Sequence, residues 1–167
     1  MTDWIETERT RMRPFEEADA EEAFAWFSDL DVMRFIPGGP DATLEDTRRR
    51  IAGYREHQAR HGFSKRIIIH RDTGKAIGDA GLFHLPDGER IELGFRLAKP
   101  CWGAGYAVEL GRAWLEWFDT HLAGQPLFAD VHPEHLRSRR VLEKLGFHPS
   151  HSELVLGMSM MIYCRQP

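Results

Sequence analysis

The spacing of hydrophobic and polar residues along the chain divides it into segments of helical and of strand-like period. Apolar residues recur at helical spacing in three segments, 19–27, 105–121 and 134–145, which predicts helices there. A fourth helix, highly polar, is predicted over 43–61, because Thr43 and Asp46 resemble a capping box and Gly62 would end the helix. Alternating or β-branched runs predict strands at 8–13, 67–69, 76–83, 91–97 and 127–131, with one or two more within 147–165.

The order of these elements predicts a mixed α+β architecture. Turn signals at residues 72–75 and 86–88 join three consecutive strands by short connections, which indicates an antiparallel meander. We therefore expect a mixed, mostly antiparallel sheet of about six to seven strands, flanked by about four helices. No Gly-, Ser- and Pro-rich linker interrupts the sequence, so residues 1–167 are predicted to form one domain.

Composition narrows the possible partners. The chain is 42% hydrophobic and 29% charged, which is typical of a globular protein and excludes wholesale disorder. A net charge of −4 argues against a nucleic-acid partner, which selects a basic surface. Two cysteines outside any CxxC pair, an acidic start and the absence of a long apolar run predict a cytoplasmic protein with no membrane partner.

A small-residue loop within 97–107, which reads LAKPCWGAGYA, is the first candidate site. Gly103 and Gly105 allow the backbone to approach a ligand closely. The helix that follows offers unpaired N–H groups and the positive end of its dipole, which suits a pyrophosphate. An ordinary turn explains two glycines equally well. Neither GxxxxGK[ST] nor a complete GxGxxG is present, so the usual nucleotide-binding loops are excluded.

The second candidate stretch is 130–147, DVHPEHLRSRRVLEKLGF, in which a predicted strand leads into a helix with Ser138 in its first turns. Further segments are TERTRMR at 7–13, DA at 19–20, IELGF at 91–95 and WGAGYAVE at 102–109. Together these segments resemble the GNAT superfamily of acyl-CoA-dependent N-acetyltransferases. The closer resemblance is to the branch of ribosomal-protein N-terminal (alanine/serine) acetyltransferases, and it covers nearly the whole chain.

This resemblance implies a GNAT-type fold that transfers an acetyl group from the cosubstrate acetyl-CoA to a primary amine. The amine, of a protein N-terminus, an amino acid or a small molecule, would attack the thioester directly in a ternary complex, and the protein would be a monomer or a homodimer. The implied coenzyme-binding residues are Phe95, Arg96, Leu97, Trp102, Gly103, Ala104, Gly105, Tyr106, Ala107, His135 and Ser138.

The resemblance also implies two catalytic residues. A free primary amine is mostly protonated at neutral pH, so the reaction needs a base, and the leaving thiolate needs an acid. Glu92 matches the family's base position, and Ser138 matches a serine proposed as the acid. A solvated glutamate and a serine that only contacts the coenzyme are the simpler alternatives, and His135 is an alternative base.

Three departures from the family pattern keep a second function open. His135 stands where the family often has asparagine, and Leu142 stands where many relatives have a tyrosine acid. Segment 157–161 lacks the acidic residue of close relatives. These departures are compatible with a non-catalytic acyl-CoA-binding or sensor protein that retains the fold.

The histidines suggest a third hypothesis, a metal-binding or purely structural domain. Two close pairs, at 132 and 135 and at 148 and 151, flank a predicted helix roughly 18 Å long. Because that length separates the pairs, we predict no metal site. His57 and His61 are expected on the solvated face of a polar helix.

The acceptor is expected between the early helices and the final strands. That region contains the apolar residues Met33, Phe35, Phe83 and Met158, for which packing in the core is the simpler explanation.

Overall fold

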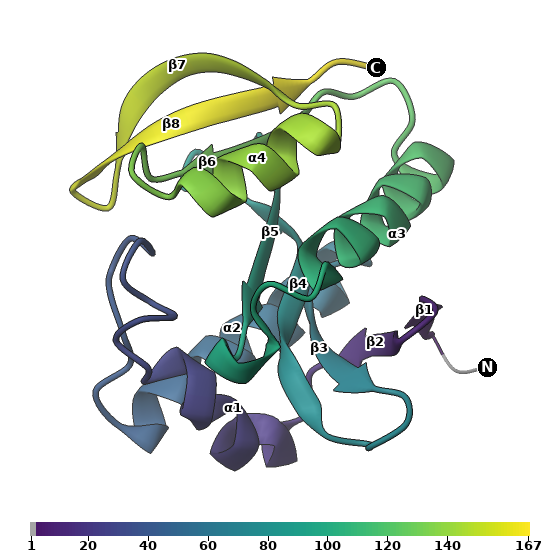
Figure 1. Ribbon diagram of the computed structural model, residues 1–167, viewed down its shortest axis with the longest axis vertical. Coiled ribbons are helices and arrows are strands. Elements are labelled where there is room, and N and C mark those ends of the chain that lie inside the picture. The colour runs from purple at the N-terminus through teal and green to yellow at the C-terminus, as the bar shows by residue number, and fades with distance from the viewer. Residues whose placement is uncertain (1–2) are drawn as a thin grey trace.

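The computed structural model describes residues 3–167, whose strands form one mixed sheet in the order β1-β2-β3-β4-β5-β6-β8-β7 (Figure 1). All neighbouring strands pair antiparallel except β5 and β6. The strands are β1 (Ile5–Glu6), β2 (Thr10–Pro14), β3 (Lys65–His70), β4 (Ala76–His84), β5 (Ile91–Leu97), β6 (Leu127–Val131), β7 (His148–Val155) and β8 (Met158–Arg165).

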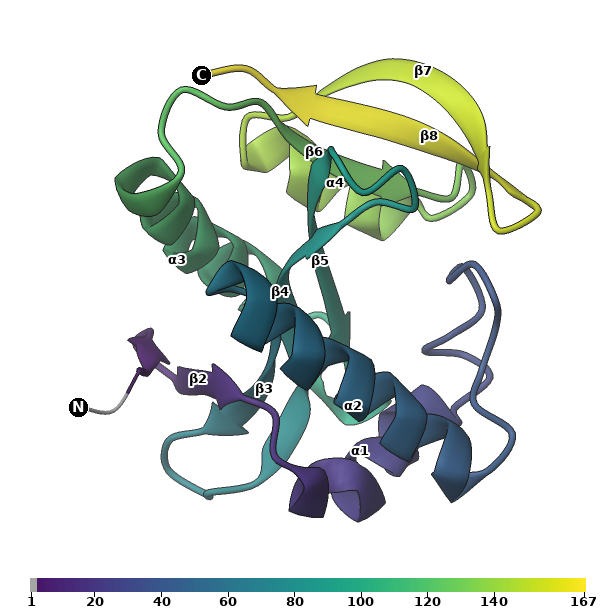
Figure 2. The same cartoon turned by 180° about the vertical axis from the view of Figure 1, so that it is seen from behind.

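Four α-helices cover the two faces of this sheet. They are α1 (Ala20–Phe27), α2 (Leu44–His61), α3 (Tyr106–His121) and α4 (Leu136–Lys144), with short 3-10 helices at Glu17–Asp19 and Lys99–Cys101. Figure 1 shows α3 and α4 in front of the sheet, and Figure 2, from behind, shows α2 in front of β4. The α+β class and the number of helices are therefore confirmed.

The sheet has eight strands, so the predicted six to seven was too low. Strand β1 has only two residues, with Ile5 opposite Met12, and is too short to show an alternating pattern in the sequence. The final segment holds two strands. The strand predicted at 8–13 lies at Thr10–Pro14, and that predicted at 67–69 extends over Lys65–His70.

The side chains of β3 show how the sheet separates two cores. Ile68 packs with the side chains of α3 and α4, whereas Ile67 and Ile69 pack with those of α1 and α2. Successive side chains of a strand point to opposite faces, and both faces of this strand are covered. This is why β3 appears in the sequence as an uninterrupted β-branched run.

Helix ends follow the expected chemistry. At α2, Thr43 and Asp46 form the predicted capping box, and Gly62 ends the helix at a φ of 79°. Helix α4 begins at Leu136, two residues later than predicted, because His135 is its N-cap. Helix α3 begins at Tyr106, with Gly105 as its N-cap.

Within residues 3–167, the one parallel pair of neighbouring strands, β5 and β6, opens a gap beside which the candidate site lies. Strands β5 and β6 pair at one position, where Glu92 lies opposite Phe128. From Leu93 to Leu97, β5 pairs with β4 alone, and from Ala129 onward β6 pairs with β8 alone. One edge of β5 therefore carries backbone groups that no neighbouring strand uses.

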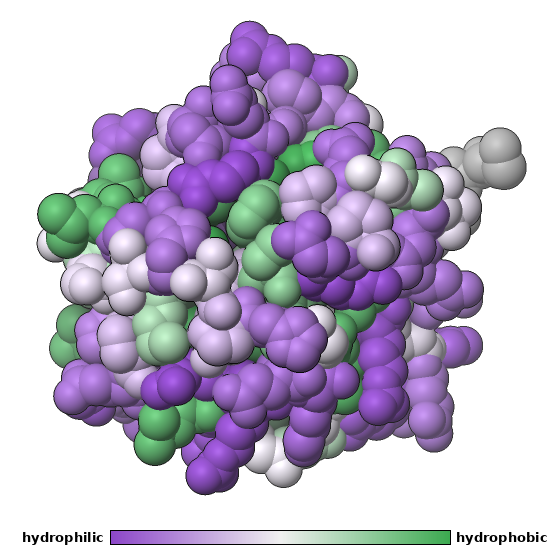
Figure 3. Space-filling model, turned by 90° about the horizontal axis from the view of Figure 1, so that it is seen from above, coloured by the Kyte–Doolittle hydropathy of each residue, from purple (hydrophilic) through white to green (hydrophobic). Residues whose placement is uncertain are grey.

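The surface is mostly hydrophilic. Figure 3 shows hydrophobic residues of one face in separate patches between polar ones. Within residues 3–167, no helix combines the length and the apolar character of a membrane span.

Candidate active site

Two cavities meet where β5 and β6 separate. One, of about 680 Å³, lies between the end of β5, the start of α3 and the start of α4. The other, of about 450 Å³, lies on the side of β4, α2 and the β7–β8 hairpin. The residues lining both are Phe35, Ile36, Phe95, Arg96, His135 and Ser138. We call the first the coenzyme cavity, because most of the predicted coenzyme residues line it, and the second the acceptor cavity, because it lies where the sequence leads us to expect the acceptor.

The glycine loop forms one wall of the coenzyme cavity. Gly103 and Gly105 have φ values of 74° and 81°, in the left-handed region that glycine adopts at little cost. Within residues 3–167, the amides from Gly103 to Val108 donate no hydrogen bond to the protein. A row of free amides at a helix N-terminus is suited to a phosphate group.

An ion pair behind this loop holds it against the N-terminal segment. Glu109 accepts hydrogen bonds from the Arg9 amide at 2.9 Å, from Arg9 Nε at 2.7 Å and from the Thr7 hydroxyl at 2.6 Å. Arg9 also donates to the Ala104 carbonyl at 2.8 Å and lies over the Tyr106 ring. The TERTRMR segment at 7–13 therefore contacts the WGAGYAVE segment at 102–109, and these contacts hold the glycine loop from behind.

His135 organises the start of α4. Its Nδ1 accepts a hydrogen bond from the Ser138 amide at 3.4 Å, so the neutral ring carries its proton on Nε2. Burial and the positive charge of Arg137 lower the pKa of His135, which favours this neutral form. The ring lies 4.9 Å from that of Phe35. The residue that departs from the family pattern is thus a helix cap in this chain.

The structure places ten of the eleven predicted coenzyme residues in the lining of the coenzyme cavity, and Ala104 lies outside that lining. Trp102 and Arg96, like His135, also have structural contacts. Trp102 donates from Nε1 to the Leu97 carbonyl at 2.8 Å. The Arg96 guanidinium is paired with the buried Asp79 and bonds to Tyr54, so it is already engaged. Both residues therefore support the cavity wall.

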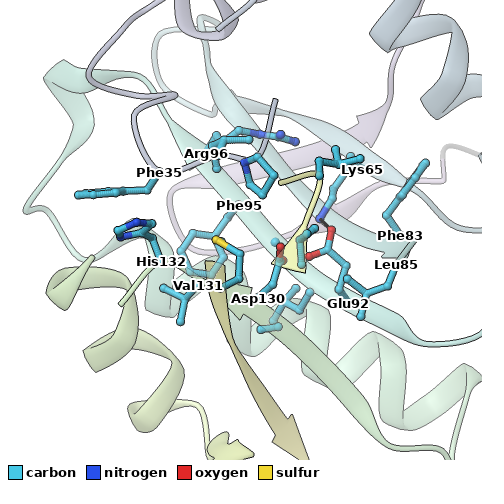
Figure 4. Close-up of a pocket in the computed structure, with 18 of the residues that line it drawn as sticks. Phe35, Lys65, Phe83, Leu85, Glu92, Phe95, Arg96, Asp130, Val131 and His132 are labelled. Atoms are coloured by element: carbon cyan, nitrogen blue, oxygen red, sulfur yellow. Dashed lines mark ion pairs between the residues drawn. The ribbon is translucent and has the colours of Figure 1, made fainter. Parts of the chain in front are cut away.

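Glu92, the predicted base, lies in the acceptor cavity with two partners that the sequence analysis missed. Lys65 Nζ lies 3.2 Å from Glu92 Oε1, and Asp130 on β6 faces the same carboxylate (Figure 4). Lys65 also donates to the Gly81 carbonyl at 3.1 Å. A Cβ on Gly94 would lie 2.4 Å from Lys65 Nζ, so a larger residue there would force this ammonium group to move.

The two carboxyl groups have pKa values shifted in opposite directions. Burial, the charge of Glu92 and a hydrogen bond between the two side chains raise the pKa of Asp130 to about 8. Burial opposes ionisation of Glu92, but the attraction of Lys65 and hydrogen bonds from Asp130 and Lys65 outweigh it, so the pKa of Glu92 is lowered. At neutral pH the proton lies on Asp130, and Glu92 is an anion.

No sequence signal could have identified this cluster. Lys65, Glu92 and Asp130 come from three strands, and they meet only because β3, β4, β5 and β6 are neighbours in the sheet. The lysine stands at the start of a hydrophobic run, and the aspartate stands in an alternating strand, where a solvated side chain is the usual expectation.

Two of the four apolar residues that the sequence analysis names for the acceptor region line the acceptor cavity. Phe35 and Phe83 line the acceptor cavity, as does Met160. Met33 is fully buried in the core with α1 and α2, and Met158 packs beside the β7–β8 hairpin.

The expectation for His57 was wrong. It is buried rather than solvated, because its helix turns that face toward Phe83 and Phe63. His61 is exposed, as expected. Within residues 3–167, three metal-ligating side chains come together only at His57, His61 and His84.

A splayed mixed sheet with a free-amide loop beside the gap is the arrangement that the resemblance to the GNAT superfamily leads us to expect. Comparison with known proteins agrees. Residues 9–148 match the family model described as "Acetyltransferase (GNAT) domain", so the chain belongs to the GNAT acetyltransferase family.

Individual relatives extend this result. The chain is 30% identical over 164 residues to "Uncharacterized protein YkkB" of Bacillus subtilis (strain 168), with 96% of this chain and 94% of the relative covered. A crystal structure of an acetyltransferase from Agrobacterium tumefaciens str. C58 aligns with a TM-score of 0.86 at 24% identity, covering 100% and 96% of the two chains.

The structural neighbours include ribosomal-protein acetyltransferases. RimL, a ribosomal L7/L12 alpha-N-protein acetyltransferase solved in complex with coenzyme A, aligns with a TM-score of 0.80 at 14% identity. The alignment covers 98% of both chains. At this identity the likeness concerns the fold.

Proposed function

We propose that the protein transfers an acetyl group from acetyl-CoA to a primary amine by direct attack in a ternary complex. The observation that carries the proposal is the junction of the two cavities at the gap between β5 and β6. One cavity offers a phosphate-binding loop, and the other offers a carboxyl pair that can exchange a proton. Two substrates that enter from opposite sides would meet at Phe95 and Ser138.

On the coenzyme side, the fit rests on the backbone. The free amides from Gly103 to Val108 would bind the pyrophosphate, and the unpaired edge of β5 from Leu93 to Leu97 would bond the extended pantetheine arm. That arm has amide groups of its own, which can pair with a strand edge as a peptide does. This path leads from the loop to the junction, where the thioester would lie.

On the acceptor side, Glu92 and Asp130 would act as one proton acceptor. The amine nitrogen attacks the thioester carbonyl carbon, and the bond from that carbon to sulfur breaks. The carboxyl pair takes the proton that the nitrogen releases, directly or through water. A backbone N–H of β5 would stabilise the oxyanion that forms during the attack.

Ser138 would return a proton to the leaving thiolate. Its hydroxyl lies in the first turn of α4 and lines both cavities, whereas Leu142, at the family's tyrosine position, is buried and apolar. Replacing Ser138 by Ala would lower kcat with little change in acetyl-CoA affinity. A contact with the coenzyme alone would instead raise the KM for acetyl-CoA.

The acceptor is proposed to be a primary amine, with a protein N-terminus among the candidates because RimL, a structural neighbour, acts on one. The test is release of coenzyme A thiol on mixing the protein with acetyl-CoA and a panel of peptides, amino acids and small amines. We expect turnover with at least one amine, and Glu92→Gln should lower it while acetyl-CoA affinity stays near wild type.

The departures at positions 135 and 142 define the alternative outcome of the same experiment. Tight binding of acetyl-CoA with no acetylation of any amine in the panel would support an acyl-CoA sensor in place of an enzyme. Failure of the folded protein to bind acetyl-CoA at millimolar concentration would overturn both.

A further inference from the structure

We propose that His57, His61 and His84 form a binding site for a divalent transition-metal ion of the Zn²⁺ class. The site lies at the edge of the acceptor cavity, since His84 is part of the lining of that cavity. It is separate from the carboxyl pair and from the glycine loop, and it does not depend on acetyl transfer.

The geometry of three imidazoles carries this proposal. One ligand nitrogen from each ring lies within 4.8 Å of the other two. His57 and His61 are one turn apart on α2 and face the same side, and His84 is the last residue of β4. The ring centroids are 4.5 Å apart for His57 and His61, 4.5 Å for His61 and His84, and 5.0 Å for His57 and His84.

The orientation of His57 is fixed as in a metal site. Its Nδ1 lies 2.7 Å from the Phe63 carbonyl oxygen, which only accepts, so Nδ1 carries the proton. Its Nε2 therefore holds an electron pair, which accepts hydrogen bonds from His84 Nδ1 at 2.8 Å and from the His84 amide at 3.4 Å and would bind the ion in their place. A metal-bound histidine commonly donates its other ring N–H to a carbonyl or a carboxylate in this manner.

Only small movements would admit the ion. Tetrahedral Zn²⁺ at about 2.0–2.1 Å from each nitrogen places the nitrogens roughly 3.3 Å apart. His57 Nε2 and His84 Nδ1 would separate slightly, and the His84 proton would move to Nε2, so no net proton is released. The exposed His61 can adjust its side chain, and the same exposure leaves a fourth position open to water.

The surroundings favour neutral, ligating imidazoles. Burial lowers the pKa of His57 to about 4 and also lowers that of His84. Phe83 stacks on His57 with centroids 4.1 Å apart, and Phe63 lies within 6.0 Å of all three rings. The nearby Lys65 is neutralised by Glu92. On the buried side of the site, an apolar shell of this kind lowers the local dielectric and strengthens metal–ligand bonds, while the side of His61 stays open to solvent.

A bound ion would connect α2 to the end of β4. Both elements form walls of the acceptor cavity, through Tyr54 on α2 and Phe83 on β4. The alternative is a purely structural hydrogen-bonded cluster in which His57 and His84 bond to each other and His61 stays solvated. Added Zn²⁺ distinguishes the two hypotheses, because only a metal site would bind it.

The test uses full-length, tag-free protein that has been stripped of metal with a chelator. Zn²⁺ is titrated against a chromophoric indicator, and Co²⁺ is titrated while the visible d–d absorption is recorded. We expect one ion per chain, with a Co²⁺ spectrum of four-coordinate intensity. His61→Ala and His84→Ala should each weaken Zn²⁺ binding by at least about tenfold and abolish that spectrum.

His148→Ala is the matched control, since it removes one exposed histidine elsewhere and should leave binding unchanged. His61 is exposed, so its removal should not disturb folding, and a thermal melt checks this. No Zn²⁺ bound to the wild type at micromolar concentration would overturn the proposal. So would binding of equal strength in His61→Ala, which would place the ion at other histidines.

Discussion

The coenzyme cavity and the acceptor cavity are built from different parts of the chain. In the coenzyme cavity, the groups that face the ligand are backbone amides and a strand edge, and their geometry depends on glycines and on an ion pair behind the loop. In the acceptor cavity, the reactive groups are side chains from separate strands. The buried Lys65 pairs with Glu92 and donates to the Gly81 carbonyl. In the proposed reaction, the first cavity would bind the acyl-CoA, and the second would select the amine and take its proton.

This difference makes the two halves separable by mutation. A change in the acceptor cavity should alter kcat and its pH dependence but not acetyl-CoA affinity, and a change behind the glycine loop should do the reverse.

The largest effect is expected when the whole charged cluster is made neutral. Combining Glu92→Gln, Asp130→Asn and Lys65→Met removes the proton acceptor without leaving an unpaired buried ion. We expect kcat to fall by about 10²–10⁴-fold, the range that general acid–base catalysis contributes. Steady-state kinetics measures this, and calorimetric titration should give an acetyl-CoA affinity near that of the wild type. Turnover that survives in the triple variant would remove the carboxyl pair from the mechanism.

The pH dependence of the rate is the next effect. Below about pH 8, Asp130 keeps its proton and only Glu92 can accept one, and its lowered pKa makes Glu92 a weak base. Above that pH both carboxyl groups are ionised, and the pair is the stronger base. The kcat/KM value should therefore rise with pH through an inflection near 8, and Asp130→Asn should lose that inflection because Glu92 is already ionised. The acceptor's own ionisation contributes equally to both profiles. Superimposable profiles would show that the pair does not titrate during the reaction.

The coenzyme cavity predicts a smaller, opposite pattern. Glu109→Ala breaks the contacts to Thr7 and Arg9 that hold the glycine loop. We expect the KM for acetyl-CoA to rise about tenfold, or about 1.4 kcal/mol, while kcat changes little. Glu116→Ala, an exposed position on the same helix, is the control and should behave as wild type. Equal effects of the two substitutions would mean that the clamp does not shape the loop.

How much of this architecture the sequence predicts depends on the range of the interactions. The helix ends at Thr43 and Gly62 and the glycine loop were predictable because capping and turn chemistry are local. The two-residue β1 was not, since its partner lies beyond a turn and it has no period to detect. Lys65 and Asp130 were missed because their contact with Glu92 is long-range. Only the order of strands in the sheet brings them to it.

The smallest predicted effect concerns stability. Folding raises the pKa of Asp130 from its ordinary value near 4 to about 8. Between these two pH values the folded protein holds a proton on Asp130 that the unfolded chain has released. Stability contributed by this group is therefore lost as the pH rises toward about 8. Asp130→Asn removes this pH-dependent loss of stability, so near pH 8 its Tm should exceed that of the wild type by a few degrees. For a chain of this length, each kcal/mol of stability shifts the Tm by about 2–4 °C.

The advantage should shrink as the pH falls toward about 5. A thermal melt across this range measures the difference. A variant that is less stable than the wild type at every pH would show that the Asp130 carboxyl is held by stabilising contacts.

The central claim is that acetyl-CoA binds on the free amides beside the gap between β5 and β6. Amide NMR spectra of the labelled protein, recorded with and without acetyl-CoA, test it most directly. The account predicts the largest shifts for Gly103 to Val108 and for Leu93 to Leu97, with amides of β1 and β2 little changed. Saturated binding that leaves the loop amides in place, or no binding at millimolar acetyl-CoA, would contradict it.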